Sequence, residues 1–200
     1  MTKMEENRLK ETIDAAVKVL RSGGVILYPT DTVWGIGCDA SDAAAVARIY
    51  EIKKRSDSKS LVLLASDMDM ICRYVRQMPE MAVSLIEVND RPMTIVYPDA
   101  VVAPGYGLAP NCVAEDGSVG IRIPLSDYCR RMTARLGKPL VSTSANISGE
   151  PTPKSFDDIS PAIKDAVDYI VCPELEKEST GFSSSVIKVG LDGEIRIIRP

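Results

Sequence analysis

The sequence predicts an α/β protein of one domain, built on a twisted sheet that mixes parallel and antiparallel strands, with helices flanking it. Short apolar runs alternate with stretches of helical periodicity over the first three quarters of the chain. The chain ends in two β-rich runs around Leu191-Asp192-Gly193, a turn typical of a hairpin. With 200 residues, 45% of them hydrophobic, and no repeat or linker, we expect a single domain over residues 1–200.

Helices are expected where apolar residues recur every three or four positions and a capping residue marks an end. Leu9, Ile13 and Val17 follow this spacing, which predicts an N-terminal helix over about residues 5–22 that ends before Gly23-Gly24. Capping signals place the further helices after Asp42, after a Ser66-x-x-Asp69 capping box, from Pro79, and between Ser126 and Gly137.

Strands are expected at the short apolar runs 24–28, 60–65, 93–97, 119–123, 139–143, 168–172, 184–189 and 194–198. The first run leads into Pro29-Thr30-Asp31-Thr32-Val33-Trp34-Gly35, which holds the only tryptophan of the chain. Ligands bind at strand ends in open α/β sheets, so hydroxyls and a carboxylate there indicate a site. A tight turn in which Thr and Asp side chains bond to nearby backbone explains the same residues.

The bulk composition excludes several classes of protein. A net charge of -4 argues against a dedicated nucleic-acid binder. The chain has no histidine, which removes Ser-His-Asp triads and histidine metal sites. Its five cysteines form no C-x-x-C pair, so we expect free thiols, a cytoplasmic location and no metal held by the protein. The N-terminus lacks a signal sequence and no run reaches membrane-spanning length, so no membrane partner is expected.

Two polar clusters are candidates for binding an anion. Lys53, Arg55 and Lys59 follow the second expected helix, where cations either clamp phosphate oxygens or simply offset the helix dipole in water. The segment 142–146 places hydroxyl and amide groups at another strand end, where a capped turn is the alternative. No glycine-rich phosphate loop is present, so a bound nucleotide would have to be held by side chains.

Taken in order, these segments resemble the YrdC-type threonylcarbamoyl-AMP synthase family in its single-domain form. The pieces that carry the resemblance are PTDTVWGIGC (29–38), the K-x-R signature Lys53-Lys54-Arg55, SKSLVLLA (58–65), GIRIP (120–124), STSANISGEPTP (142–153) with its S-x-N signature, and SSSVIKV (183–189). The resemblance implies a YrdC-like fold and ATP-dependent synthesis of L-threonylcarbamoyladenylate from L-threonine and bicarbonate. The resemblance further implies that pyrophosphate is released and that the product feeds threonylcarbamoyl-adenosine modification of tRNA.

The resemblance also implies roles for individual residues. Threonine would be bound by Thr32, Arg122, Ser142 and Ser184. ATP would be bound by Arg55, Lys59, Ser118, Ser144, Asn146, Thr152 and Arg199. Lys53 and Arg55 would be catalytic, with Lys53 helping to hold the phosphates. Mg²⁺ would arrive with ATP, and the implied partners are the downstream tRNA threonylcarbamoyl-transfer proteins, with weak RNA contact.

Two other functions fit parts of the same pattern. One is a YrdC-like nucleotide- or RNA-binding protein without synthase activity, against which the presence of both signatures argues. The other is the carbamoyl-transfer domain of hydrogenase-maturation proteins, which brings zinc-finger cysteines that this chain lacks. Clustered cations suit the synthase because three anionic reactants must share one cavity.

Overall fold

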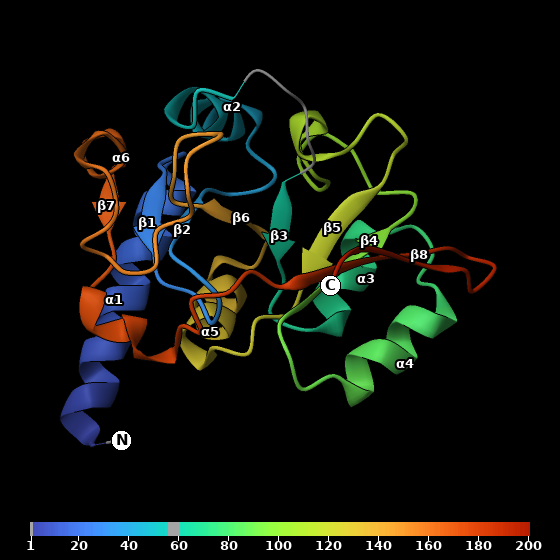
Figure 1. Ribbon diagram of the computed structural model, residues 1–200, viewed down its shortest axis with the longest axis horizontal. Helices are drawn as coiled ribbons and strands as arrows, with labels where there is room; N and C mark the ends of the chain where they lie inside the picture. Colours follow the sequence, from blue (N-terminus) through green and yellow to red (C-terminus); the bar gives the residue numbers. More distant parts are fainter. Residues whose placement is uncertain (1, 56–60) are drawn as a thin grey trace.

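The computed structural model describes residues 2–55 and 61–200. Within them the chain forms a nine-stranded mixed sheet in the order β7-β1-β2-β6-β3-β5-β4-β8-β9 (Figure 1). The strands are β1 (Ile26–Tyr28), β2 (Gly35–Gly37), β3 (Val62–Leu64), β4 (Met93–Tyr97), β5 (Val119–Arg122), β6 (Leu140–Ser144), β7 (Tyr169–Ile170), β8 (Ser185–Val189) and β9 (Ile195–Arg199). The pairs β1–β7, β3–β5 and β4–β8 are parallel and the other pairs antiparallel, which confirms the expected mixed α/β sheet.

Helices pack on both faces of this sheet because its strands alternate apolar side chains to the two sides. One core joins Ile26 and Tyr28 to α1 (Lys3–Arg21) and α5 (Asp127–Leu136). The other core joins Val25 and Leu27 to the opposite layer, formed by α2 (Ala43–Ile52), α3 (Met68–Tyr74), α4 (Glu80–Val88), α6 (Pro161–Ala166) and the 3-10 turn η1 (Pro110–Cys112). A second 3-10 segment, η2 (Pro173–Glu178), follows β7.

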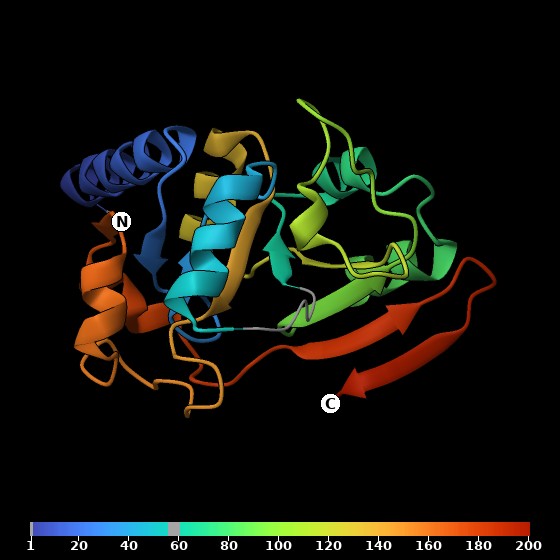
Figure 2. The same ribbon diagram turned by 90° about the horizontal axis from the view of Figure 1, so that it is seen from above.

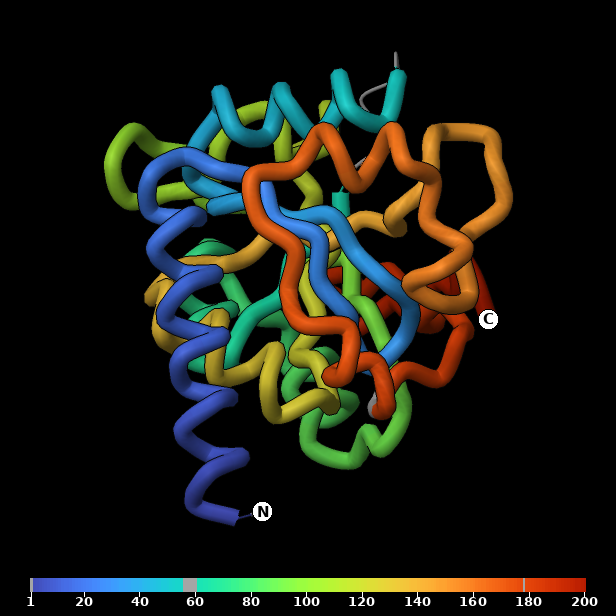
Figure 3. The backbone as a smooth tube through the Cα atoms, turned by 90° about the vertical axis from the view of Figure 1, so that its left-hand side faces the viewer, coloured from blue at the N-terminus to red at the C-terminus, as the bar shows by residue number. Residues whose placement is uncertain are grey.

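The ends of the sheet differ in how much helix covers them. Figure 3 shows the β7 edge, with α1 along one side of the sheet and α2 across its top. At the far end, the β8–β9 hairpin lies away from α1 (Figure 2). No helix among the described residues is long and apolar enough to cross a membrane.

Most predicted helix ends are confirmed by capping contacts. The N-terminal helix begins two residues before the expected start, because Thr2 and Glu5 form a capping box. Asp42 caps α2 with its carboxylate, and Gly137 ends α5 with φ 82. The capping box assigned to Ser66 is wrong: the cap of α3 is Asp67, whose carboxylate accepts from the amide of Met70.

Strand β2 lies where the sequence indicated only a loop. It is short and two of its three residues are glycines, so no apolar run marks it. A Cβ at Gly37 would lie 2.4 Å from the carbonyl oxygen of Val141 and 2.8 Å from the ring of Tyr28. Only glycine lets the chain return antiparallel to β1 and pair with β6 at this distance. This return brings the Thr30–Trp34 loop back to the sheet.

Candidate functional site

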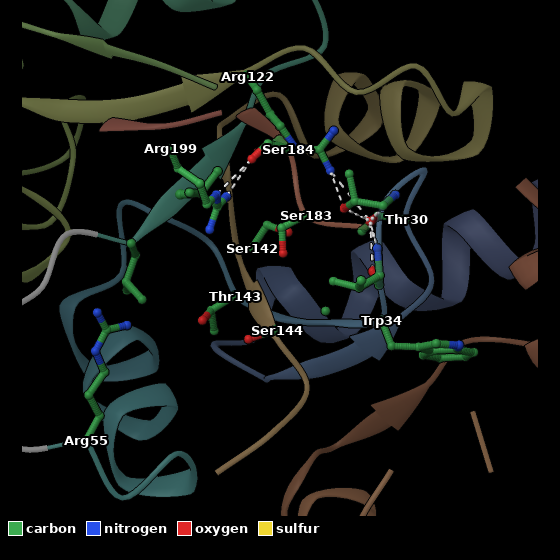
Figure 4. Close-up of a pocket in the computed structure, with 15 residues that line it drawn as sticks. Thr30, Trp34, Arg55, Arg122, Ser142, Thr143, Ser144, Ser183, Ser184 and Arg199 are labelled. Atoms are coloured by element: carbon green, nitrogen blue, oxygen red, sulfur yellow. Dashed lines mark hydrogen bonds between the residues drawn. The ribbon is translucent and has the colours of Figure 1, made fainter. Parts of the chain in front are cut away.

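The sheet face that α1 and α5 cover at one end is open further along. Leu64 and Leu140 belong to the core under these helices. Arg122 is the register partner of Leu64, and Ser142 lies two residues after Leu140, so both continue the same face. Here the surface is hollowed into a cavity of about 160 Å³ (Figure 4). Its lining is Thr30, Thr32, Val33, Trp34, Gly35, Arg55, Leu61, Val62, Arg122, Ser142, Thr143, Ser144, Ser183, Ser184 and Arg199.

The loop after β1 is held by its own hydroxyls. The Thr30 hydroxyl donates to the carbonyl of Val33 at 2.8 Å and accepts from the amides of Thr32 and Val33. Since the single Thr30 proton is used there, the Thr32 hydroxyl donates across the 2.7 Å contact between the two side chains. The carbonyl of Thr32 accepts from the amide of Gly181 at 2.8 Å, which ties the segment before β8 to this loop.

A buried ion pair lies behind the loop. The Nη1 atom of Arg122 donates to both carboxylate oxygens of Asp31 at 2.8 Å, and the amide of Leu125 donates to the same carboxylate at 3.0 Å. The Asp31 and Arg122 side chains are only 5% and 3% exposed. The Nη2 atom of Arg122 donates to the Thr32 hydroxyl at 3.1 Å, so the cation and the threonine form one network.

The two cations of the K-x-R signature point to different places. Lys54 adopts a left-handed conformation with φ 49, which turns the chain at the end of α2. Arg55 lines the cavity, and its guanidinium lies 5.9 Å from the centre of the Tyr50 ring. Lys53 is buried instead, with Nζ donating to the carbonyl of Ser144 at 2.5 Å and to that of Asn146 at 2.7 Å. Burial, and secondarily the charge of Arg55, lowers the pKa of Lys53 to about 8.

The far wall of the cavity comes from the C-terminal hairpin. The Ser184 hydroxyl is buried and hydrogen-bonded to that of Thr94 at 2.8 Å. The Ser184 carbonyl accepts from Nε and Nη2 of Arg199 at 3.0 and 2.7 Å, which anchors the last strand to the rim. Figure 4 shows Arg122, Arg199 and Arg55 placed around the ring of serines and threonines. A cavity that holds three cations and many hydroxyls suits an anionic ligand.

The structure brings seven of the predicted site residues together in the lining: Thr32, Arg55, Arg122, Ser142, Ser144, Ser184 and Arg199. Four others lie outside it. Lys53 and Asn146 are near the turn after β6, Ser118 donates to the Asp116 carboxylate, and Thr152 is exposed on the following loop. Lys59 falls outside the described residues.

Some residues of the candidate site were not assigned from the sequence. Thr30, Trp34, Thr143 and Ser183 line the cavity, and Asp31 holds the Arg122 guanidinium. The sequence signal for them was the clustering of polar residues at the ends of three strands: after β1, at the end of β6 and before β8. Asp31 needed the tertiary structure, because its partner lies 91 residues away along the chain.

Within residues 2–55 and 61–200, the lining offers hydroxyls and cations but no carboxylate. Among the residues that the structure describes, no three His, Cys, Asp or Glu side chains come close enough to hold a metal. The donor set therefore does not fit a dedicated magnesium cage, since Mg²⁺ prefers carboxylate oxygens from the protein. An ion that enters with a polyphosphate needs no such cage.

Comparison with known proteins gives the family. A family model described as telomere recombination, Sua5_yciO_yrdC, matches residues 18–200. A threonylcarbamoyl-AMP synthase of Stenotrophomonas maltophilia is 32% identical over 92% of this chain and 96% of its own length. One from Chromohalobacter salexigens is 37% identical over 80% of this chain and 85% of its own.

A solved structure agrees with this family. The structure of P. abyssi Sua5 complexed with L-threonine matches with a TM-score of 0.79 and 26% identity, over 88% of this chain. The match spans 50% of that chain. The names of the curated relatives confirm the expected enzyme class, a threonylcarbamoyl-AMP synthase. The chain belongs to the Sua5/YciO/YrdC family, as the resemblance of its motifs predicted.

Proposed function

We propose that this protein synthesises L-threonylcarbamoyladenylate from L-threonine, bicarbonate and ATP, and releases pyrophosphate. The observation that carries this proposal is one cavity lined by three arginines and many hydroxyls, with no carboxylate among those lining residues that the structure describes. The relatives named threonylcarbamoyl-AMP synthase and the Sua5 structure with bound threonine support the choice of substrates.

Threonine would bind at the Thr32 end of the cavity. The Thr32 hydroxyl already donates to Thr30 and accepts from Arg122, so its remaining lone pair can accept from the substrate amine or hydroxyl. The hydroxyls of Ser142 and Ser184 lie in the same lining. A site that hydrogen-bonds the substrate hydroxyl rejects valine, because valine would leave the partner of that hydroxyl unpaired.

ATP would lie along the other side, with Arg55 and Arg199 facing its phosphates and Ser144 between them. Ser118, Asn146 and Thr152 lie outside the lining, so they would contact only the part of ATP that extends beyond this cavity. Lys59, beyond the described residues, would be a further phosphate ligand. Mg²⁺ would be the ion that ATP brings.

The reaction has two steps. The threonine nitrogen attacks the carbon of bicarbonate, water leaves, and a carbamate forms. A carbamate oxygen then attacks the α-phosphorus of ATP, and the bond to pyrophosphate breaks. Arg55 and Arg199 would offset the charge that builds on the phosphoryl oxygens, while the serines and threonines orient the reactants. Holding the reactants together can supply ~7–11 kcal/mol of the barrier lowering.

The product would pass to tRNA threonylcarbamoyl-transfer proteins, which attach the group to an adenosine of tRNA. Direct contact with RNA would be weak, because the chain carries a net charge of -4 and most of its attraction to phosphates would be local to the cavity.

Pyrophosphate release, measured with each of ATP, threonine and bicarbonate omitted in turn, tests the proposal. We expect release only with all three present, and the adenylate as a second product by mass spectrometry. Release that does not depend on threonine and bicarbonate would show a different reaction.

A further inference from the structure

The ammonium of Lys53 lies between the end of α2 and the turn that follows β6. The residue is 3% exposed and is absent from the cavity lining. Its Nζ donates to the carbonyls of Ser144 and Asn146 at 2.5 and 2.7 Å. A buried ammonium is stable only when such acceptors replace water, so these contacts account for its position.

The same turn is held at further points by the backbone. The amide of Ser148 donates to the carbonyl of Lys53 at 2.9 Å, and the amide of Ala145 donates to the carbonyl of Trp34 at 2.9 Å. Lys53 therefore forms hydrogen bonds to the turn through its side chain, at Ser144 and Asn146, and through its backbone carbonyl, at Ser148. This joins the K-x-R signature to the S-x-N signature as one structural unit.

Ser144 is the residue that links this unit to the cavity. Its carbonyl faces Lys53, while Ser144 itself lines the cavity. Holding the carbonyl restrains the backbone of Ser144 and with it the direction of the Cα–Cβ bond, which limits the rotamers from which the hydroxyl can reach the cavity. The left-handed backbone at position 54 places Lys53 under the turn and Arg55 at the cavity, while the Lys54 side chain is exposed and takes no part.

We propose that Lys53 is a positioning residue, whose ammonium holds the carbonyls of Ser144 and Asn146 and so aims Ser144 into the cavity, rather than a ligand of the ATP phosphates. The effect on catalysis rests on the proposed synthase function. The hold on the turn does not, because it exists in the protein without substrate.

Three variants separate these roles. Lys53→Met removes the charge and the donors, Lys53→Gln removes the charge but keeps two N–H donors, and Lys54→Met removes the same charge from the exposed neighbouring residue. We expect Lys53→Met to lower kcat/KM for pyrophosphate release by ~10²-fold, and Lys53→Gln to recover at least ~10-fold of that loss. Lys54→Met should retain the wild-type rate. Equal losses in Met and Gln would indicate that the charge itself contacts phosphate, and would overturn the proposal.

Amide hydrogen exchange without substrates tests the turn directly. In Lys53→Met the amides of Ala145 and Ser148 should exchange at least about tenfold faster than in wild type, and in Lys53→Gln less so. Unchanged exchange in Lys53→Met, or faster exchange with a wild-type rate of pyrophosphate release, would refute the positioning role. If Lys53→Met does not fold, the exchange rates and kcat/KM of Lys53→Gln are compared with those of wild type instead. Wild-type values for both in Lys53→Gln would then refute the positioning role. Should wild type itself release no pyrophosphate, the proposed function fails, while exchange still decides whether Lys53 holds the turn.

Discussion

Replacing Asp31 by asparagine isolates the buried ion pair behind the candidate site. The substitution keeps the size of the side chain but removes its charge, and it places an NH₂ group where an oxygen accepts hydrogen bonds. In the native structure that carboxylate accepts from Arg122 at 2.8 Å on each oxygen and from the Leu125 amide at 3.0 Å. The asparagine amide cannot accept all of these bonds, and the Arg122 charge stays buried at 3% exposure.

The expected loss is large because the pair is buried. Removing one partner of a buried ion pair costs ~3–5 kcal/mol, since the remaining charge loses its compensation. For a domain of this size each kcal/mol corresponds to about 2–4 °C, so Tm should fall by roughly 6–20 °C. We also expect the KM for threonine to rise, because Arg122 donates to the Thr32 hydroxyl at 3.1 Å and would lose its fixed position.

The assay is urea unfolding at neutral pH, paired with pyrophosphate-release kinetics well below Tm. Asp14→Asn is the matched control, because Asp14 forms a 3.0 Å ion pair with Arg135 in which both side chains are exposed to solvent. This control should stay within about 1 kcal/mol of wild type. The double variant Asp31→Leu/Arg122→Met should recover part of the lost stability, since it leaves no lone charge. A loss below ~1 kcal/mol in Asp31→Asn would refute the reasoning.

Three further substitutions probe single contacts. Arg55→Met should lower kcat/KM for ATP by ~10²-fold in steady-state assays, while Lys54→Met should not. Equal values of kcat/KM in the two variants would show that Arg55 does not contact the ATP phosphates. Because burial lowers the pKa of Lys53 from 10.5 to about 8, the folded protein releases this proton before the unfolded chain does. Between these pH values, unfolding free energy should therefore rise with pH in wild type relative to Lys53→Met, by at most about 1.4 kcal/mol per pH unit; a flat difference contradicts this. Gly37→Ala would place a Cβ 2.4 Å from a backbone oxygen, so its unfolding free energy in denaturant should fall by ~1–3 kcal/mol. Gly120→Ala, whose nearest contact would be at 3.4 Å, should lose less stability. Similar losses in the two variants would show that β2 shifts to accommodate the added methyl group.

Local patterns predicted most of the fold. Helical spacing predicted the N-terminal helix from about residue 5, a short apolar run predicted the strand from Met93 to Tyr97, and single residues such as Asp42 and Gly137 marked helix ends. These features depend on neighbours within a few residues, so they are legible in the sequence. Strand β2 was missed because its glycines carry no hydrophobic signal and are required by a contact with a distant strand.

By itself the sequence determined the fold class, the family resemblance and the residue types that the chemistry needs. Motifs and periodicity involve residues close together along the chain, so they can be recognised without a structure. Only the tertiary structure decided which of those residues share a cavity. It buried Lys53 under the Ser144–Asn146 turn while placing Arg55 in the lining, although the two are neighbours in one signature. It also gave Asp31 its role, because an ion pair with Arg122 depends on the sheet register and on the loop after β1 that carries Asp31 back to β5, which no short segment encodes.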